Sequence, residues 1–347
     1  KWLTYNNTFI TETGDIYKEA IDNKYTIQSP KGGPYLFKMH KLEDASLLDF
    51  TNPAAVAWAK KVYQGGLDIG ADGWMADFCE WLPPDAVLHD GSDAMLHHNA
   101  YPVAYQKFNR ELFDAQHAKD GKDRAWFVRS AWLGSQKYVD VVWAGDQQTD
   151  WSAGDGMRSV IPMGLGLGVV GFPYYGHDIG GYADLFAEGA TTKELFFRWV
   201  TLGAFSPVMR THHGRNAAAN WHWEKDASST EHIARWGRLH GRLYPVLRRA
   251  AERAHESGLP MMRPLAIDHP TFEPGWSMTD QYMLASLYVS PIVDKGATSR
   301  TIQLPKGTYR PLLGGDSLLS DGEKSLTVEA EMAEIPVHVR AGAVLVL

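Results

Sequence analysis

Short apolar runs alternate with helix-forming stretches over most of this chain, and that alternation limits the possible folds more than any other feature. The strand-like runs lie at residues 2–10, 47–50, 70–77, 125–130, 139–146, 168–175 and 207–210. The helix-like stretches lie at residues 14–20, 54–65, 99–116, 157–167, 192–205 and 230–254. Alternation of this kind, repeated about six times, indicates parallel strands joined by helical crossovers and therefore an α/β fold.

Polar side chains stand where these apolar runs end. They are Asp77, Arg129, Asp146, Asp178 and Arg210. In a barrel of eight strand–helix units, active sites are built at the C-terminal ends of the strands. An open doubly wound sheet, the alternative, would concentrate a ligand at one crevice, whereas here nearly every strand end contributes a polar group. The sequence therefore predicts a (β/α)8 TIM barrel.

The strand count suggests that the barrel is incomplete at its N-terminal side. The sequence supplies six strand–helix units, and the barrel needs about eight. The chain also begins on Lys1, directly before a strand-like run. We expect two upstream strands to be missing, and we expect a segment with two open edges not to fold alone. A start of this kind cannot report on secretion, and we expect a cytoplasmic protein.

The alternation of strands and helices gives way to a succession of short strands near residue 264. Short strand-like runs follow at residues 282–291, 301–305, 308–310, 326–328 and 335–339. Strands at this spacing, with glycine and aspartate turns between them, indicate an all-β sandwich. We therefore predict a barrel domain over residues 1–268 and a β-sandwich domain over residues 269–347.

Composition excludes several classes of partner. The net charge of the 347 residues is −7, which does not suit a nucleic acid but leaves room for a small anionic substrate. The absence of an apolar run of eighteen residues or more predicts no membrane span. The single cysteine, Cys79, cannot form an internal disulfide.

Two carboxylates carry the catalytic hypothesis. Asp77 and Asp146 each end an apolar run that contains a tryptophan, Trp74 or Trp143. Glycoside hydrolysis generally needs a pair of carboxyl groups, one ionised and one protonated. The alternative for each aspartate is a helix cap or a structural ion pair at a strand end. We expect the two tryptophans to line a sugar pocket.

Other polar residues are candidates for substrate binding. We expect Arg129 to contact substrate, to pair with a carboxylate, or both. Glu80 follows Asp77 by three residues in the sequence. Asp178, before Gly180 and Gly181, is a site residue or part of a turn. The candidates are Glu80, Arg129, Asp178, Tyr182, Arg210 and His212.

Adjacent histidines raise the question of a metal. His212 and His213 follow Arg210, but no further ligands stand at the fixed spacing of metal motifs. We therefore favour hydrogen bonds to sugar hydroxyls, and we expect neither a metal nor an organic cofactor.

The motifs together resemble glycoside hydrolase family 31. The matching segments are residues 48–53, 73–77, 143–147, 177–181, 209–212 and 304–309. The resemblance covers essentially the whole chain. Within the family, residues 74–78, 82–83, 98–100, 134–138 and 144–147 are most similar to the sulfoquinovosidases. Gln147 follows the acid aspartate where the common α-glucosidases of the family tend to carry asparagine.

The resemblance implies a retaining exo-α-glycosidase. Asp77 would be the nucleophile and Asp146 the general acid/base, with carboxyl groups about 5 to 5.5 Å apart; about 6.5 to 9.5 Å would indicate inversion. Arg210 and His212 would bind sugar hydroxyls, and Tyr182 would lie near the sulfonate of the substrate. The partner would be a small carbohydrate, either neutral or sulfonated.

Three departures leave other activities open. Cys79 stands where a glycine is expected, and residues 171–176 are more similar to the α-glucosidase or α-galactosidase branches. The family's upstream arginine and tryptophan, which grip the sulfonate, have no counterpart in this chain. The alternatives are an α-glucosidase or α-galactosidase, a related transglycosylase, and an inactive carbohydrate-binding relic.

Overall fold

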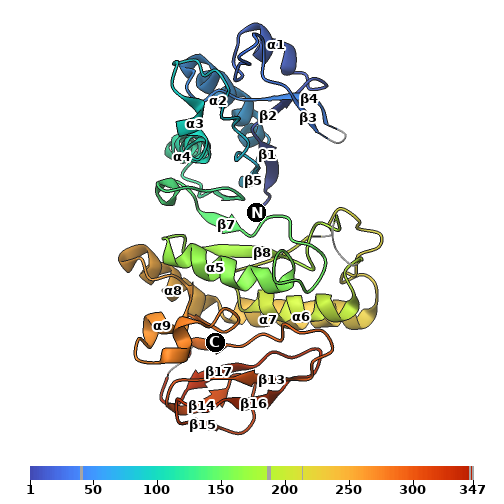
Figure 1. The fold of residues 1–347 in the computed structure, drawn as a ribbon, viewed down its shortest axis with the longest axis vertical. Helices are drawn as coiled ribbons and strands as arrows, with labels where there is room; N and C mark the ends of the chain where they lie inside the picture. The colour runs from blue at the N-terminus through green and yellow to red at the C-terminus, as the bar shows by residue number, and fades with distance from the viewer. Residues whose placement is uncertain (40–41, 186–188, 213, 344, 346–347) are drawn as a thin grey trace. The chain divides into compact units, whose positions relative to one another are not determined.

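The computed structural model describes residues 1–39, 42–185, 189–212, 214–343 and 345. It consists of two compact units, Lys1–Val142 and Trp143–Leu347 (Figure 1). Each unit is described by itself below. No helix among the described residues is long and apolar enough to cross a membrane.

Parallel strands form the centre of the first unit. In spatial order they are β1 (Thr4–Asn7), β5 (Gly73–Asp77), β6 (Ala125–Val128) and β7 (Val141–Trp143), whose last residue belongs to the second unit. The connecting helices α2 (Pro53–Asp68) and α4 (Tyr101–Asp120) pack against each other. Asn52 caps α2 by accepting hydrogen bonds from the backbone of Ala54 and Ala55, and Pro53 occupies the first helical position.

A small antiparallel sheet accompanies these strands. Its order is β2 (Phe9–Thr11), β4 (Leu42–Leu47) and β3 (Phe37–Met39). The short helical elements of this unit are α1 (Tyr17–Asp22), α3 (Ala94–His97) and η1 (Ser135–Lys137). The predicted strand at 47–50 is therefore wrong, since β4 ends at Leu47. The Asp49 carboxylate instead shapes a turn, because it accepts hydrogen bonds from Thr51 and from the backbone of His89.

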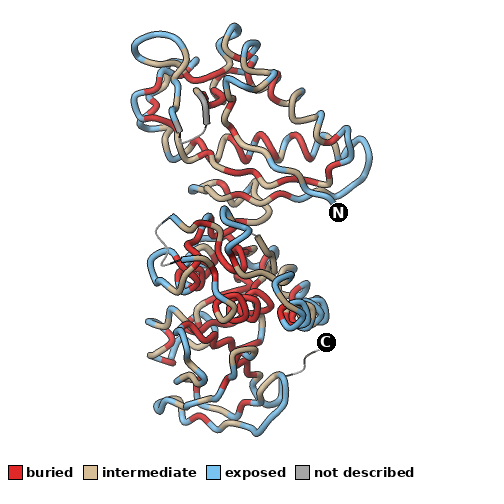
Figure 2. The backbone as a smooth tube through the Cα atoms, turned by 90° about the vertical axis from the view of Figure 1, so that its right-hand side faces the viewer, coloured by how far each residue is buried: buried red, intermediate tan, exposed pale blue. Residues whose placement is uncertain are grey.

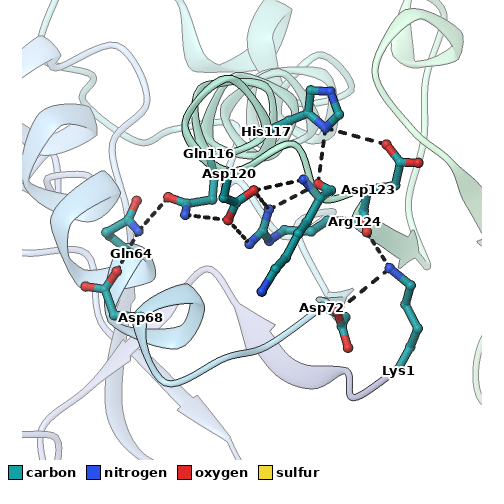
Figure 3. Close-up of polar contacts among 10 residues, drawn as sticks. Lys1, Gln64, Asp68, Asp72, Gln116, His117, Asp120, Asp123 and Arg124 are labelled. Atoms are coloured by element: carbon teal, nitrogen blue, oxygen red, sulfur yellow. Dashed lines mark hydrogen bonds and ion pairs between the residues drawn. The ribbon is translucent and has the colours of Figure 1, made fainter.

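A polar network marks the N-terminal ends of β5 and β6 (Figure 3). Arg124 donates to both carboxylate oxygens of Asp120 at 3.0 and 2.6 Å, and these bonds hold the pKa of Asp120 below its usual range. Lys1 donates to the carbonyl of Asp123 at 2.6 Å and lies 3.8 Å from the carboxylate of Asp72. Polar groups at this end of barrel strands serve stability rather than catalysis.

The second unit contains a parallel pair of strands, β8 (Tyr175–Ile179) and β9 (Val208–Thr211). Its helices are η2 (Met157–Ser159), α5 (Val160–Val169), α6 (Lys193–Ala204), α7 (Ala227–Arg242) and α8 (Tyr244–Ser257). Every residue of α6 from 195 to 204 is buried (Figure 2). Within the described residues the parallel strands number six, as the alternation predicts.

Two predicted elements of this unit have different bounds. The strand expected from residue 168 begins at Tyr175, because α5 runs to Val169. The glycines there serve helix packing: a Cβ on Gly164 would lie 2.7 Å from the Tyr175 ring. The long helix expected at 230–254 is two helices, and Pro245 in the first turn of α8 prevents a continuous helix.

Two antiparallel sheets complete the second unit. The larger has the order β10 (Met262–Arg263), β11 (Tyr282–Leu284), β12 (Leu287–Val289), β17 (Val337–Arg340), β14 (Gly307–Pro311), β15 (Leu318–Ser320). The smaller pairs β13 (Ser299–Ile302) with β16 (Leu326–Glu329), and the short helices are α9 (Leu265–Asp268) and η3 (Glu273–Trp276). Tyr288, Tyr309 and Ile302 share one buried cluster, with Leu326 packed against it, so side chains of both sheets form a common core. The boundary at residue 268 stays a prediction.

A buried arginine ties α6 to the loops that surround the antiparallel sheets. Arg198 is 1% exposed, and its guanidinium donates to four backbone carbonyls. The acceptors are Ala297, Ala330, Glu331 and Glu334, at 2.6 to 3.1 Å. A planar fork of donors suits this arrangement in a way that an ammonium group does not.

We expect Arg198→Met to destabilise the intact protein by about 3 kcal/mol or more, because buried carbonyls would lose their donors. Arg198→Lys should recover only part of this loss, since lysine cannot reach four acceptors at once. The control is Arg238→Met on the exposed face of α7, which should change stability by less than about 0.5 kcal/mol. Unfolding in guanidinium chloride measures the stability of the three variants. Equal unfolding midpoints for Arg198→Met and Arg238→Met would contradict the stabilising role of Arg198.

Candidate active site

Asp77 closes β5 and is the best-organised carboxylate of the first unit. It is 7% exposed. The Tyr5 hydroxyl donates to Asp77 Oδ2 at 2.8 Å, and the backbone N–H of Phe78 donates to Oδ1 at 2.8 Å. Arg129 Nη1 lies 3.5 Å from Oδ1. Two hydrogen bonds and one ion pair therefore fix the orientation of the carboxylate.

Tyr5 was missed by sequence reasoning, although β1 pairs directly with β5. The register places Tyr5 opposite Met75 and Asn7 opposite Asp77, so these residues point to one face of the sheet. Partial burial of the hydroxyl, and then the charge of Asp77, raise the pKa of Tyr5. The phenol consequently stays protonated and acts as a donor to Asp77.

Glu80 orients Arg129. The Arg129 guanidinium donates to Glu80 Oε1 through Nε at 3.0 Å and also through Nη2, and Trp81 Nε1 donates to the same oxygen at 2.9 Å. The guanidinium also lies 4.0 Å from the centre of the Phe78 ring. The structure thus brings together three predicted residues, Asp77, Glu80 and Arg129, with Glu80 holding the cation that faces Asp77.

The backbone after Asp77 is strained. Phe78 and Cys79 have φ angles of 59° and 88°, in the left-handed region that favours glycine. Such conformations cost of order 1–3 kcal/mol each and cluster at functional sites. The turn lets the Phe78 carbonyl accept a hydrogen bond from Ser130 Oγ at 2.7 Å. Burial raises the pKa of the Cys79 thiol, whose side chain is fully buried.

The prediction that Trp74 lines a sugar pocket requires correction. Its side chain is 0% exposed, donates to Asn109 Oδ1 at 2.7 Å and packs on Phe113 of α4. Residues three apart on a strand point to opposite faces, so Trp74 and Asp77 cannot share one pocket wall. Trp74 is a core residue.

Asp146 is an exposed carboxylate of the second unit. Residues 144, 145 and 147–149 around it are buried, while Asp146 itself is exposed. Gln147 anchors this turn, because its side chain donates to Ala144 and its carbonyl accepts from the backbone N–H groups of Tyr182 and Ala183. The loops after β7 and β8 are therefore joined, and Asp146 is presented to solvent.

Asp178 and Arg210 form an ion pair across β8 and β9. The parallel register places them side by side, and Arg210 Nη1 donates to Asp178 Oδ1. The Arg210 guanidinium lies 5.8 Å from the centre of the Trp143 ring. Trp143 is 2% exposed, so it supports Arg210 and offers little surface of its own for stacking.

Tyr182 and His212 make a second contact pair. Their rings meet edge to face, with centres 4.8 Å apart. His212 Nδ1 accepts a hydrogen bond from the backbone N–H of Gly214 at 3.0 Å, so the neutral ring carries its hydrogen on Nε2. That tautomer makes Nε2 a donor suited to a sugar hydroxyl. His213 lies outside the described residues.

His177, beside Asp178, is a buried neutral histidine that sequence reasoning did not single out. Trp199 Nε1 donates to its Nδ1 at 3.0 Å, and Ser206 Oγ lies 2.9 Å from Nε2. Burial, assisted by the charge of Arg210, lowers the pKa of His177 to about 3. It fixes β8 against α6 without adding a charge beside Asp178.

Three buried histidines give the second unit an acid-sensitive stability. Burial lowers the pKa of His177 to about 3 and those of His232 and His338 to about 4. The unfolded chain binds these protons near pH 6.5 and the folded chain does not. The free energy of unfolding should therefore be constant above pH 7 and fall between pH 6.5 and 4, by up to about 1.4 kcal/mol per histidine and pH unit.

Denaturant unfolding from pH 7.5 to 5 checks this expectation. His177→Gln should reduce the slope with pH, whereas His255→Gln, at an exposed position of α8, should leave it unchanged. A slope that is the same in the wild type and in His177→Gln would contradict the buried neutral histidine.

The described residues contain no group of three or more histidine, cysteine, aspartate or glutamate side chains that could hold a metal ion. The structure brings the predicted residues together in two sets. One set, in the first unit, is Asp77, Glu80 and Arg129. The other, in the second unit, is Trp143, Asp178 and Arg210, with Tyr182 packed on His212. Asp146 stands on the loop that Gln147 joins to Tyr182.

Comparison with protein families covers nearly the whole chain. A model described as the TIM-barrel domain of glycosyl hydrolases family 31 matches residues 2–250. A model described as the C-terminal domain of the same family matches residues 258–345. The predicted TIM barrel followed by a C-terminal β domain is thereby confirmed.

Similar proteins are known from bacteria. The chain is 37% identical over 345 residues to a sulfoquinovosidase of Escherichia coli, covering 98% of this chain and 50% of that protein. It is 34% identical to a sulfoquinovosidase of Agrobacterium fabrum, covering 98% of this chain and 51% of that protein. The chain therefore spans about half the length of the curated relatives that it matches.

Solved structures agree with this grouping. A family 31 sulfoquinovosidase from E. rectale, in complex with an aza-sugar inhibitor, superposes with a TM-score of 0.93 at 32% identity. That alignment covers 99% of this chain and 51% of the other. A Flavobacterium johnsoniae dextranase complexed with glucose gives a TM-score of 0.88 at 26% identity, covering 99% and 43% of the two chains.

Proposed function

This chain belongs to glycosyl hydrolase family 31, and from that membership we propose that it is part of a retaining exo-α-glycosidase that releases sulfoquinovose from α-sulfoquinovosides. Two relatives at 37% and 34% identity carry the name sulfoquinovosidase, which supports this substrate over a neutral sugar. The observation that carries the chemistry is the carboxylate of Asp77, which three donors orient at the end of β5.

The proposed reaction has two displacements. Asp77 attacks the anomeric carbon, while Asp146 donates a proton to the departing glycosidic oxygen, so that the glycosidic bond breaks as the ester bond forms. Asp146, now ionised, then removes a proton from water, which attacks the same carbon and releases Asp77. Both steps proceed on side chains alone, and the anomeric configuration is retained.

Each carboxylate has surroundings that suit its role. The hydrogen bonds from Tyr5 and from the Phe78 N–H, together with the ion pair to Arg129, hold the Asp77 carboxylate in one orientation, as a nucleophile requires. Asp146 stands exposed among buried neighbours, where it can exchange protons with a leaving group and with water.

The remaining candidates are proposed to hold the sugar. Arg210, paired with Asp178, and His212, with its hydrogen on Nε2, are suited to sugar hydroxyls. Tyr182 is proposed to contact the sulfonate. Glu80 acts on substrate through Arg129 rather than by direct contact. Cytoplasmic localisation stays an expectation.

Substrate preference in the intact protein tests the proposal. We expect turnover of 4-nitrophenyl α-sulfoquinovoside with a kcat/KM at least a hundredfold above those for the α-glucoside and α-galactoside. The first sugar product, observed by proton NMR before mutarotation, should be the α-anomer. Preference for a neutral sugar would place the enzyme among the family's α-glucosidases or α-galactosidases. Transfer of the sugar to added acceptors in preference to water would indicate a transglycosylase. Failure to turn over any of the three glycosides would indicate an inactive carbohydrate-binding protein.

A further inference from the structure

The second unit contains a cavity of about 450 Å³ that includes none of the proposed catalytic or sugar-binding residues. It is bounded by α8, by the loop after it and by strands β11, β12 and β17. This volume falls within the range of small-molecule sites in proteins. Arginines from two separate elements, Arg249 and Arg253 on α8 and Arg340 on β17, line it.

The cavity carries an excess of positive charge. Among the ion pairs of the described residues, none involves Arg249, Arg253 or Arg340. Among the described residues, Asp268 is the one acidic side chain in the lining, and Arg263 holds it through Nε at 2.6 Å and Nη2 at 3.0 Å. The lining therefore contains four arginines and one aspartate, a net charge of three positive. Arginine binds phosphate, sulfonate and carboxylate groups well.

Much of the remaining lining is apolar, with His269 and Ser286 as its polar members. Met283 and Tyr288 are 4% exposed and form the buried wall, and Pro260 and Leu259 close one side. Tyr288 and His269 engage each other, with the hydroxyl 2.6 Å from His269 Nε2, and burial lowers the pKa of His269. A compact inorganic ion would leave this apolar surface unused.

A second hollow of about 470 Å³ shares part of its lining with the first. The two share Arg253, Leu259 and Pro260, and the second extends to Val169 and Ile267. Val169 and Ile267 are 61% and 41% exposed. Arg253 therefore lines both a cationic hollow and a neighbouring one with exposed apolar side chains.

We propose that this pair of cavities binds an anionic amphiphile, a small molecule with a phosphate, sulfate, sulfonate or carboxylate head and an alkyl or aryl body. The head lies among Arg249, Arg253 and Arg340, and the body lies along Leu259 and Pro260 toward Ile267. The three arginines are exposed, but Arg340 reaches the same hollow from a different element, with its Nη2 also donating to the Lys306 carbonyl at 3.2 Å. The site is independent of the proposed glycosidase activity.

Isothermal titration calorimetry on the intact protein tests the site, with octyl phosphate below its critical micelle concentration as the probe. Inorganic phosphate and octanol serve as the head-only and body-only comparisons. We expect octyl phosphate to bind at least tenfold more tightly than either. Arg253→Gln and Arg340→Gln should each weaken it about tenfold or more, with unchanged melting temperatures and unchanged glycoside turnover.

The matched control is Arg248→Gln, on the same helix, because Arg248 pairs with Glu252 at 3.0 Å along the surface and does not line either cavity. This variant should bind octyl phosphate as the wild type does. The proposal is overturned if octyl phosphate fails to bind, if inorganic phosphate binds as tightly, or if the Arg253 and Arg340 variants bind like the Arg248 variant.

Discussion

Asp77→Asn should lower kcat/KM by a factor on the order of 10⁴ to 10⁶, the range found when a catalytic nucleophile is removed. The amide keeps the shape of the carboxylate and can still meet Tyr5 and the Phe78 N–H, but it cannot form the glycosyl ester. Steady-state kinetics on the intact protein with an activated aryl glycoside provide the measurement. Melting temperature should change little, because the fold does not depend on the ester chemistry.

Asp72→Asn is the matched control for this variant. Asp72 immediately precedes β5 at the strand's other end, where it accepts a hydrogen bond from the Trp2 backbone at 2.8 Å and lies near Lys1 (Figure 3). Its replacement removes a carboxylate from the same segment but should leave kcat/KM within a few-fold of the wild type. Near-normal turnover by Asp77→Asn, or equal losses in the two variants, would remove Asp77 from its role.

Asp146→Asn should separate substrates by the quality of their leaving groups. An alkyl aglycone needs a proton as the bond breaks, so its kcat/KM should fall about 10³- to 10⁴-fold. A nitrophenolate leaves without that help, so formation of the glycosyl-enzyme should fall far less, and hydrolysis of the ester should become rate-limiting. Rapid-mixing kinetics should therefore show a burst of nitrophenolate that the wild type lacks.

Azide gives this second variant an independent readout. Azide attacks the glycosyl-enzyme without a general base, so it should raise the steady-state rate of Asp146→Asn and give an α-glycosyl azide by retention. It should not raise the rate of Asp77→Asn, which forms no glycosyl-enzyme. A loss that is uniform across leaving groups and insensitive to azide would argue against Asp146 as the acid/base.

Glu80 and Arg129 illustrate how far the sequence alone could go. Their positions after strands mark them as candidate site residues. The sequence also allows Arg129 to pair with a carboxylate. The structure adds that Arg129 meets Glu80 and Asp77 together, through different nitrogens. No spacing in the sequence predicts this, because 49 to 52 residues separate the arginine from its partners.

The strained turn at Phe78 and Cys79 was visible only indirectly. The family resemblance implies a glycine where this chain has Cys79, which points to an unusual backbone, but it does not give the φ angle of 88° that Cys79 adopts. Trp74 shows the opposite error. Its proximity to Asp77 in the sequence suggested a shared pocket, while the alternation of strand side chains places it in the core.

The sequence by itself determined the alternation of strands and helices, the change to short antiparallel strands, and the strand-end placement of Asp77 and Arg129. These features depend on near neighbours along the chain, through apolar periodicity and turn-forming residues. Only the tertiary structure decided that Tyr5 donates to Asp77, that Arg198 binds four distant carbonyls and that arginines of α8 and β17 line one cavity. Strands of a parallel sheet are buried on both faces, so their apolar pattern does not reveal which side chain meets which distant partner.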